Sequence, residues 1–396
     1  MTGWRRAALA LFLCVVLVGC TNEDHGDGAP PTSTTQDGFA VPAPDSLDQT
    51  KVDLPWQLAD NEYAARPQAT IGQKYMMRAD PNAAATENDE GLTVVRVADR
   101  KPVANYVRSA PDRRLHGLYF WRDTAIVQEI TDIAAGDEGG RIHLTRYDLL
   151  TGTRAPLHAA DGRRLGYLSA AALAGDQFAV AIEKDGQKDR CLHVFDLPTG
   201  TGTDVSCMPP GQNGIFSIRG SDSGFTYLTT DGATLASCRI AYRIPLPARP
   251  TVDSHVVGGY RGCHVFDHTQ VGNWDVWSEI PEAADKINNH GFAVLKAQQG
   301  PHNVTLGVID SSSLITCGSH VYWRQPKRPQ HKSHQIVRWQ PGHPKVEVVY
   351  EADTDPDGAA WTLNFPECSQ NVLTLVQSRP TARHPAAREV RFLPAT

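Results

Sequence analysis

The segment Asp353-Thr354-Asp355-Pro356-Asp357-Gly358 has the composition of a site for a hard cation. Its three carboxylates, Asp353, Asp355 and Asp357, alternate along the chain, so a tight turn can bring them together. Gly358 permits the sharp bend that such a turn needs, and carboxylate oxygens are the ligands that calcium prefers. The segment therefore predicts either a calcium loop or an acidic, solvated turn between two strands.

The same segment resembles the first half of an EF-hand calcium loop and the calcium loops of integrin-like propellers. Two departures count against calcium. An EF-hand loop needs glutamate at its twelfth position, where this chain has Asn364, and the integrin-like loop needs aspartate where this chain has Trp361. We therefore expect the acidic turn, and calcium is the one cofactor that the sequence leaves open.

Local motifs for catalysis are absent from the sequence, which has no Gly-x-Ser-x-Gly, no phosphate loop, no His-Glu-x-x-His and no dinucleotide fingerprint. The segments Trp274-Asp275-Val276-Trp277 and Tyr322-Trp323-Arg324 could stack on sugar rings, but aromatic residues that alternate along a strand more often lie in a core. The formal net charge of −6 argues against a nucleic-acid partner, which needs a clustered positive surface.

The N-terminus indicates where the protein is located. Arg5 and Arg6 precede an apolar run from Ala7 to Val18, which leads into Gly19 and Cys20. That run is shorter than the roughly 20 residues a helix needs to cross a bilayer. The segment resembles the signal peptide of bacterial lipoproteins, with Leu17 to Cys20 as the lipobox.

The resemblance implies that residues 1–19 are removed and that Cys20 is linked to a diacylglycerol. The mature protein would then be held at the extracytoplasmic face of the cell membrane by this lipid anchor. An ordinary secretory signal that contains a cysteine is the alternative.

Six further cysteines lie beyond the signal, namely Cys191, Cys207, Cys238, Cys263, Cys317 and Cys368. An even number of cysteines in an exported chain predicts disulfides. No Cys-x-x-Cys spacing, which would favour zinc, is present. Proximity along the chain favours the pairs Cys191–Cys207, Cys238–Cys263 and Cys317–Cys368, although the sequence alone leaves the pairing open.

Composition divides the mature chain into two parts. Residues 20–54 are polar and turn-rich, which predicts a flexible, disordered linker between the lipid and a domain. From residue 55 to 396, short apolar runs such as 178–182 and 346–350 alternate with Gly, Asp, Pro and Asn turns. These runs have the length of strands, and long amphipathic helix patterns are absent. The sequence therefore predicts an all-β domain over 55–396.

A repeat indicates the architecture of this domain. The run from Tyr147 to Gly152 recurs 48 residues later as the run from Phe195 to Gly200, with the shared pattern aromatic-Asp-Leu-x-Thr-Gly. We expect the aromatic ring to be buried, the aspartate to cap the turn, and the glycine to take the positive φ of a tight hairpin.

The repeat resembles the blades of WD40-like, pyrroloquinoline-quinone-type and TolB-like β-propellers. A domain of about 340 residues with this period predicts a single seven-bladed propeller, and six or eight blades remain open. A pair of β-sandwiches is the alternative. We expect the last strand, Glu389 to Leu393, to pair with an N-terminal strand and close the ring.

Two functions are compatible with this interpretation. The first is a membrane-anchored binding or scaffold propeller outside the cytoplasm, whose ligand is a protein, a peptide or a cell-envelope glycan. The second is an extracytoplasmic polysaccharide lyase or hydrolase with its site in the propeller channel. Acidic, histidine or tyrosine side chains with perturbed pKa values in the channel would favour the enzyme, and a lining of small or apolar groups would favour binding.

Overall fold

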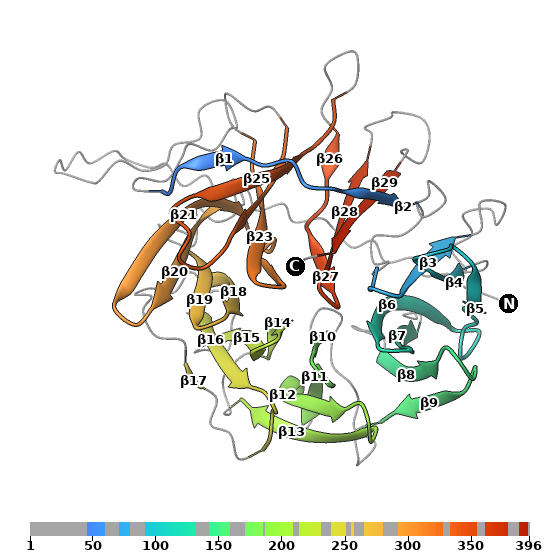
Figure 1. Ribbon diagram of the computed structural model, residues 1–396. Coiled ribbons are helices and arrows are strands. Elements are labelled where there is room, and N and C mark those ends of the chain that lie inside the picture. Colours follow the sequence, from blue (N-terminus) through green and yellow to red (C-terminus); the bar gives the residue numbers. More distant parts are fainter. Residues whose placement is uncertain are drawn as a thin grey trace, which may run out of the picture.

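The computed structural model describes residues 46–59, 71–79, 92–131, 142–158, 171–184, 187–208, 214–230, 239–250, 255–256, 265–279, 292–327, 333–354, 361–378 and 388–394. These residues form 29 strands and no helix, so the all-β prediction is confirmed. Among them there is accordingly no apolar helix that could span a membrane. The strands form seven sheets arranged as blades around a central axis (Figure 1), which confirms the seven-bladed propeller.

The blades follow one another along the chain. Blade one contains β3 (Tyr75–Ala79), β4 (Leu92–Arg96) and β5 (Pro102–Asn105). Blade two contains β6 (Arg113–Trp121), β7 (Thr124–Thr131), β8 (Ile142–Asp148) and β9 (Arg154–Leu157). Blade three contains β10 (Ala171–Ala174), β11 (Gln177–Lys184), β12 (Gln187–Asp196) and β13 (Thr201–Cys207). Blade four contains β14 (Phe216–Ser221), β15 (Gly224–Thr230), β16 (Arg239–Pro245) and β17 (His255–Val256).

The remaining blades include two strands from the N-terminus. Blade five contains β18 (Val265–Val271), β19 (Trp274–Glu279), β20 (Phe292–Gln299) and β21 (His302–Asp310). Blade six contains β22 (Ile315–Cys317), β23 (His320–Gln325), β24 (Gln335–Trp339), β25 (Val346–Glu351) and β1 (Gln49–Lys51). Blade seven contains β26 (Thr362–Leu363), β27 (Glu367–Ser369), β28 (Val372–Ser378), β29 (Arg388–Pro394) and β2 (Gln57–Ala59).

The repeated turn has the geometry that its sequence predicts. In blade three, Asp196 Oδ2 accepts a hydrogen bond from the Thr199 N–H at 3.2 Å, and Gly200 has a φ of 74°. In blade two, Asp148 Oδ1 accepts from the Thr151 N–H at 2.9 Å, and Gly152 has the same φ. The aspartate therefore caps the turn and the glycine takes the left-handed conformation, which other residues adopt at a cost.

The hydrophobic core lies between the blades. One cluster joins blades two and three through side chains such as Ile126 and Phe195, and another joins blades five and six through residues such as Val276 and Trp323. Each blade therefore packs one apolar face on the preceding blade and the other on the following blade. Because every blade depends on two neighbours, the ring has to be closed at blade seven.

Residues 46–59, which we call the N-terminal strap, close the ring (Figure 1). β2 pairs with β29 in antiparallel register and becomes the outer strand of blade seven, as the prediction for the final strand requires. β1 adds to the outer edge of blade six, parallel to β25. The Leu47 N–H also donates to the Thr305 carbonyl of blade five at 3.0 Å. The strap thus holds three consecutive blades from the outside.

The predicted boundary at residue 54 is therefore too late, because residues 46–54 belong to the propeller. The segment looks like linker in the sequence because it joins the propeller mainly through backbone pairing with open sheet edges, with Leu47 and Leu54 as its apolar side chains that pack on the core. Backbone pairing leaves little trace in composition.

Trp56 is the main side-chain contact of the strap. Its ring packs edge-on against Tyr350 at 5.5 Å between centroids, and its Nε1–H donates to the Val349 carbonyl at 2.9 Å. We predict that Trp56→Ala lowers the free energy of unfolding by about 2 kcal/mol, because a half-buried ring and a hydrogen bond are lost together. Leu58→Ala, in the same strap but 46% exposed, should change it by less than about 0.5 kcal/mol. Urea denaturation measures both, and equal effects would contradict a clamping role for Trp56.

Candidate ligand channel

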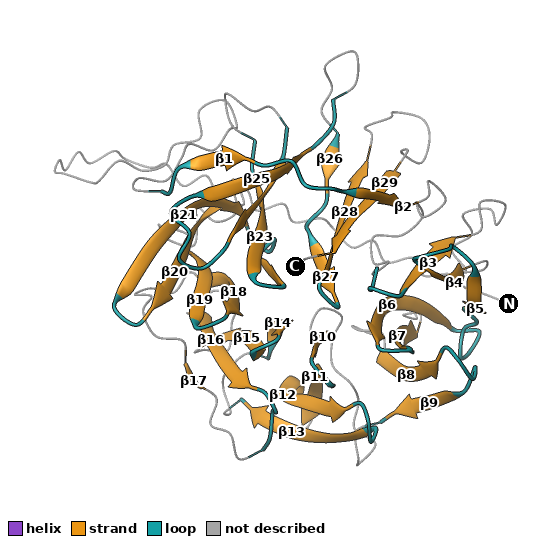
Figure 2. Ribbon diagram, in the orientation of Figure 1, coloured by secondary structure: helices purple, strands orange, loops and turns teal. Residues whose placement is uncertain are grey.

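The innermost strands of the blades lie around the central axis (Figure 2), and two adjoining cavities between them form what we call the channel. Its outer part is a cavity of about 530 Å³ at the turns that follow the inner strands. Its inner part is a cavity of about 430 Å³ between the inner strands themselves. Both parts share the wall residues Leu173, Gly220, Thr316, Cys368 and Gln370. The channel is therefore assembled from strands that are far apart in the sequence.

Ion pairs between neighbouring blades fix the mouth of this channel. The Lys74 ammonium of blade one lies 3.1 Å from Asp123 Oδ1 in the first turn of blade two, and the Tyr75 hydroxyl donates to the same oxygen at 2.8 Å. Trp121 Nε1 donates to Oδ1 of Asp176 in blade three at 2.8 Å, and Arg122 Nη2 donates to Oδ2 of the same residue at 2.8 Å. Exposed pairs of this kind add little stability, but they set the orientation of the turns around the opening.

A buried carboxylate and an arginine lie next to the inner cavity. Asp267 on β18 is 1% exposed, and its Oδ2 accepts from the Ser312 N–H at 2.6 Å and from the Ser278 hydroxyl at 3.3 Å. Arg219 on β14 lines the cavity, with its Nη2 3.9 Å from Asp267 Oδ1. Burial raises the pKa of Asp267 to about 6, and the positive charge of Arg219 opposes that rise.

Glu367 and Tyr119 line the same inner cavity. Water reaches the Glu367 side chain, but protein atoms surround most of it. This burial raises the pKa of Glu367 to about 7, and Arg219 opposes part of the rise. Burial, followed by the charge of Glu367, raises the pKa of Tyr119 to about 12. The channel thus contains an acid that titrates near neutral pH, beside a phenol that stays protonated.

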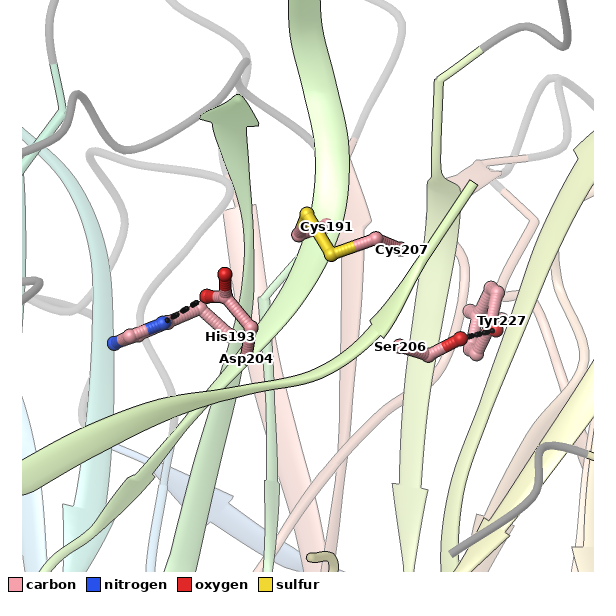
Figure 3. The surroundings of a disulfide bond; sticks show 6 residues. All are labelled: Cys191, His193, Asp204, Ser206, Cys207 and Tyr227. Carbon is pink, nitrogen blue, oxygen red and sulfur yellow. Dashed lines mark hydrogen bonds and ion pairs between the residues drawn. A yellow bond between two sulfur atoms is a disulfide. The ribbon is translucent and has the colours of Figure 1, made fainter. Parts of the chain in front are cut away.

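Two of the three expected cysteine pairs are present. Cys191 and Cys207 face each other across β12 and β13 and are joined by a disulfide (Figure 3). Cys317 is bonded to Cys368, which links the inner strands of blades six and seven at the channel wall. Cys238 and Cys263 lie outside the described residues, so their pairing stays a prediction, as does the lipidation of Cys20.

The surroundings of the first disulfide contain a cluster that has the spacing of a metal site. One ligand atom each from Cys191, Cys207 and Asp204 lies within 4.8 Å of the others. Both sulfurs are used by the disulfide, and Asp204 Oδ1 lies 2.8 Å from Nδ1 of the buried His193 (Figure 3). Because a metal needs free thiolates, this cluster serves the structure of blade three instead.

The predicted calcium loop is described only at its start, since Asp355 and Asp357 lie outside the described residues. Asp353 Oδ2 accepts a hydrogen bond from Gln377 Nε2 at 2.5 Å and lies 3.8 Å from Arg391 Nη2. An arginine at this distance competes with a metal cation for the carboxylate. The surroundings of Asp353 therefore favour the acidic turn, and calcium binding stays a prediction.

The aromatic segments that could have stacked on sugars lie mainly in the core. Trp277, Tyr322 and Trp323 are at most 2% exposed. Trp274 is half-buried and packs edge-on against Trp339, with 5.2 Å between ring centroids. These rings stabilise contacts between and within the blades and do not line the channel.

The channel residues Arg219 and Glu367, and the buried Asp267 next to Arg219, were not predicted. They belong to blades four, five and seven, so no local motif contains more than one of them. The available signal was a charged residue at the end or the start of a short apolar run, as at the end of Phe216-Ser217-Ile218-Arg219. Such a charge on an innermost strand has to face the channel or be paired, and the blade assignment alone would have placed it there.

Comparison with known proteins identifies the fold and no family. No family model matches the chain, and no curated protein matches it either. Among solved structures, a post-proline cleaving enzyme from Rickettsia typhi has a TM-score of 0.50 and 10% identity, over 80% of this chain and 50% of that one. An acylaminoacyl peptidase from Pyrococcus horikoshii has a TM-score of 0.46 and 9% identity, over 67% of this chain and 43% of that one.

The β-propeller domain of the Trilobed protease from Pyrococcus furiosus has a TM-score of 0.43 and 9% identity, over 69% of this chain and 80% of that domain. The chain therefore spans half or less of the length of the first two enzymes. At such low identities these likenesses show no function for this chain, and its propeller fold is established by its own seven sheets.

Glu367 should make the stability of the protein depend on pH. The unfolded chain ionises Glu367 near a pKa of 4.5 and the folded protein near 7, so the folded state binds more protons between these values and stability falls as pH rises through that window. Glu367→Gln cannot ionise. We predict that it raises the free energy of unfolding by about 2 kcal/mol near pH 8 and leaves it unchanged near pH 4.

Urea denaturation at the two pH values measures this difference. Asp222→Asn, at an exposed turn of the channel mouth, is the matched control and should have an effect below about 0.5 kcal/mol at both. A Glu367→Gln effect that is the same at both pH values would show that Glu367 ionises normally in the folded protein.

Proposed function

We propose that this protein is a lipid-anchored, extracytoplasmic propeller that binds a ligand in its central channel. One observation carries the binding function. Two joined cavities, of about 530 and 430 Å³, are lined by polar side chains from several blades, including an arginine and an acid that are not used in strong ion pairs. Concave spaces with a few convergent polar groups are the usual form of ligand sites. The ligand is a protein segment, a peptide or a cell-envelope glycan.

The N-terminal strap supports the proposed membrane anchor. Its described residues, 46–59, pair with the outer strands of blades five, six and seven, away from the two cavities, which is compatible with an anchor at Cys20.

The anchor is tested by Cys20→Ala. We expect this variant to leave the membrane fraction and appear in the soluble extracytoplasmic fraction, because the lipid has no other attachment point. Cys14→Ala, which lies within the predicted signal peptide, is the matched control and should remain in the membrane fraction. Fractionation followed by immunoblotting distinguishes the two. Tight membrane association of Cys20→Ala would refute the anchor.

Channel binding is tested by filling the channel. Leu173 lines both cavities, so Leu173→Trp should narrow the space and lower the affinity for any channel ligand at least tenfold. Leu150→Trp places the same bulk on a side chain that is 71% exposed at an outer turn, and should not affect affinity. A calorimetric screen of cell-envelope peptides and glycan fragments provides the readout. Binding that is insensitive to Leu173→Trp would place the ligand elsewhere.

A second candidate function is a polysaccharide lyase or hydrolase. The specific observation in its favour is Glu367, whose pKa of about 7 suits a general acid or base at neutral pH. The pKa of Tyr119, raised to about 12, keeps this phenol protonated at neutral pH, so it can donate a hydrogen bond but cannot serve as a base. Incubation with polyuronates and neutral polysaccharides, followed by analysis of chain length, separates the candidates, since turnover that Glu367→Gln abolishes would establish the enzyme.

A further inference from the structure

A glutamine from the second strand of blade two reaches the inner cavity beside a glycine. Gln128 on β7 lies opposite Gly117 on the inner strand β6, and both residues line the inner cavity. Gly117 leaves room for the glutamine, since a β-carbon at position 117 would lie 2.8 Å from Gln128 Oε1 and 3.5 Å from the Tyr119 hydroxyl. The glycine therefore lets an amide of the second strand and a phenol of the inner strand meet at one place in the cavity wall.

The chain does not use these two polar groups itself. Gln128 is only 2% exposed, yet its amide has no hydrogen-bond partner among the described residues, and neither has the Tyr119 hydroxyl. In contrast to the buried Arg219 Nε, the polar atoms of Gln128 and Tyr119 keep accessible surface in the cavity. A nearly buried amide without a partner is costly, so a ligand that pairs with it would stabilise the site. An amide and a hydroxyl can each both donate and accept, as the hydroxyl groups of a ligand can.

The surroundings of these groups favour an uncharged ligand. Burial is the main cause of the raised pKa of Glu367, which shows that the cavity solvates a charge poorly. Arg219 also lines the cavity, but its guanidinium is directed to the Ser312 carbonyl and the Asp267 carboxylate. A charged group on a ligand would therefore lose its hydration without gaining a free partner of opposite charge beside Gln128.

The cavity has a polar side and an apolar side. Its polar side includes Gln128 and Tyr119 from blade two and Glu367 from blade seven. Blades three, four and six contribute the apolar side chains Leu173, Ile218 and Ile315. A sugar ring, with hydroxyl groups around its edge and C–H groups on its faces, matches such a lining. An extended peptide has N–H and C=O groups on both sides, and those that face the apolar side would lose their hydrogen bonds.

We propose that the inner cavity binds a neutral sugar residue, whose hydroxyl groups pair with the Gln128 amide and the Tyr119 hydroxyl while a ring face packs on Leu173 and Ile218. The volume of about 430 Å³ lies in the range of cavities that hold small ligands. This inference rests on the proposed binding function and specifies its ligand as a neutral glycan, in place of a peptide or an acidic polysaccharide.

Calorimetry on the full-length protein tests the proposal with neutral probes and two controls. The probes are maltotriose, cellotriose, mannotriose and triacetylchitotriose. Trigalacturonate is the acidic control, and acetyl-trialanine amide is the peptide control. We expect at least one neutral trisaccharide to bind at least tenfold more tightly than either control.

Gln128→Leu keeps the approximate size of the side chain and removes both of its hydrogen-bonding functions. It should weaken binding of that trisaccharide at least tenfold. Its urea midpoint should be no lower than that of the unmodified protein, because the amide has no partner among the described residues. Gln57→Leu, exposed on the outer strand β2, is the matched control and should bind normally. A structural role of Gln128 would give the opposite pattern, with a lower urea midpoint and unchanged affinity.

Two further variants test the same contact from its other sides. Tyr119→Phe removes only the hydroxyl and should weaken binding at least threefold, which is the usual effect of losing one neutral hydrogen bond. Gly117→Ala adds a β-carbon that would displace the Gln128 amide, and it should weaken binding at least threefold as well.

Three results would overturn the proposal: no binding of any neutral trisaccharide, equal binding of either control, or sugar binding that Gln128→Leu and Tyr119→Phe leave unchanged. A peptide whose binding Leu173→Trp abolishes would overturn the sugar inference and leave channel binding intact. Sugar binding that Leu173→Trp does not affect would place the sugar outside the channel and remove both.

Discussion

The architecture depends on hydrogen bonds between the two ends of the described chain. β2 pairs with β29 through the register Gln57 to Phe392 and Ala59 to Val390, which completes blade seven. Without β2, β29 would present an open sheet edge, and blade seven would be held mainly by its side-chain packing on blades six and one. Blade seven supplies Glu367 and Cys368 to the channel wall. Closing the ring therefore also sets the geometry of the candidate site.

The disulfide between Cys317 and Cys368 acts on the same part of the ring. It closes a loop of 51 residues, for which the loss of chain entropy predicts about 4 kcal/mol of stabilisation. The bond joins the inner strands of blades six and seven, whereas the N-terminal strap joins their outer strands. Blades six and seven are thus joined at their inner strands by the disulfide and at their outer strands by the N-terminal strap. The two ends of the described chain meet at these two blades. A covalent tie at the inner radius is well placed to keep Glu367 at a fixed distance from the opposite wall.

Those parts of the fold that depend on local pattern were predictable, and those that depend on the ring were less so. The 48-residue repeat predicted blades because Asp148 and Asp196 cap equivalent turns. The short separation of Cys191 and Cys207 along the chain predicted that they pair with each other. β1 was missed because an added edge strand pairs through its backbone. Arg219, Asp267 and Glu367 were missed because propeller geometry gathers residues from separate blades, and their types alone do not distinguish a channel wall from a solvated surface. The contact that makes them a site exists only after closure.

A comparison of two arginines shows why the channel differs from an ordinary buried ion pair. Arg324 Nε lies 2.5 Å from Asp310 Oδ2, its Nη1 donates to the Leu363 carbonyl, and its guanidinium stacks on Phe365 at 4.3 Å. That arginine is satisfied by the chain itself. Arg219 also lies beside a carboxylate, that of Asp267 on the inner strand β18, yet its Nε has no acceptor among the described residues and the ion pair is long.

Keeping the Nε of Arg219 buried without an acceptor is costly, and a hydrophobic or fully paired residue at position 219 would be more stable. The same holds for Glu367, whose raised pKa measures what burial costs its ionised form. Two such costs in one cavity are expected where a site is organised for a ligand rather than for stability. The physical case for function at the channel therefore rests on the hydrogen-bonding and charged groups that lack partners there, in contrast to Arg324, whose guanidinium is paired within the chain.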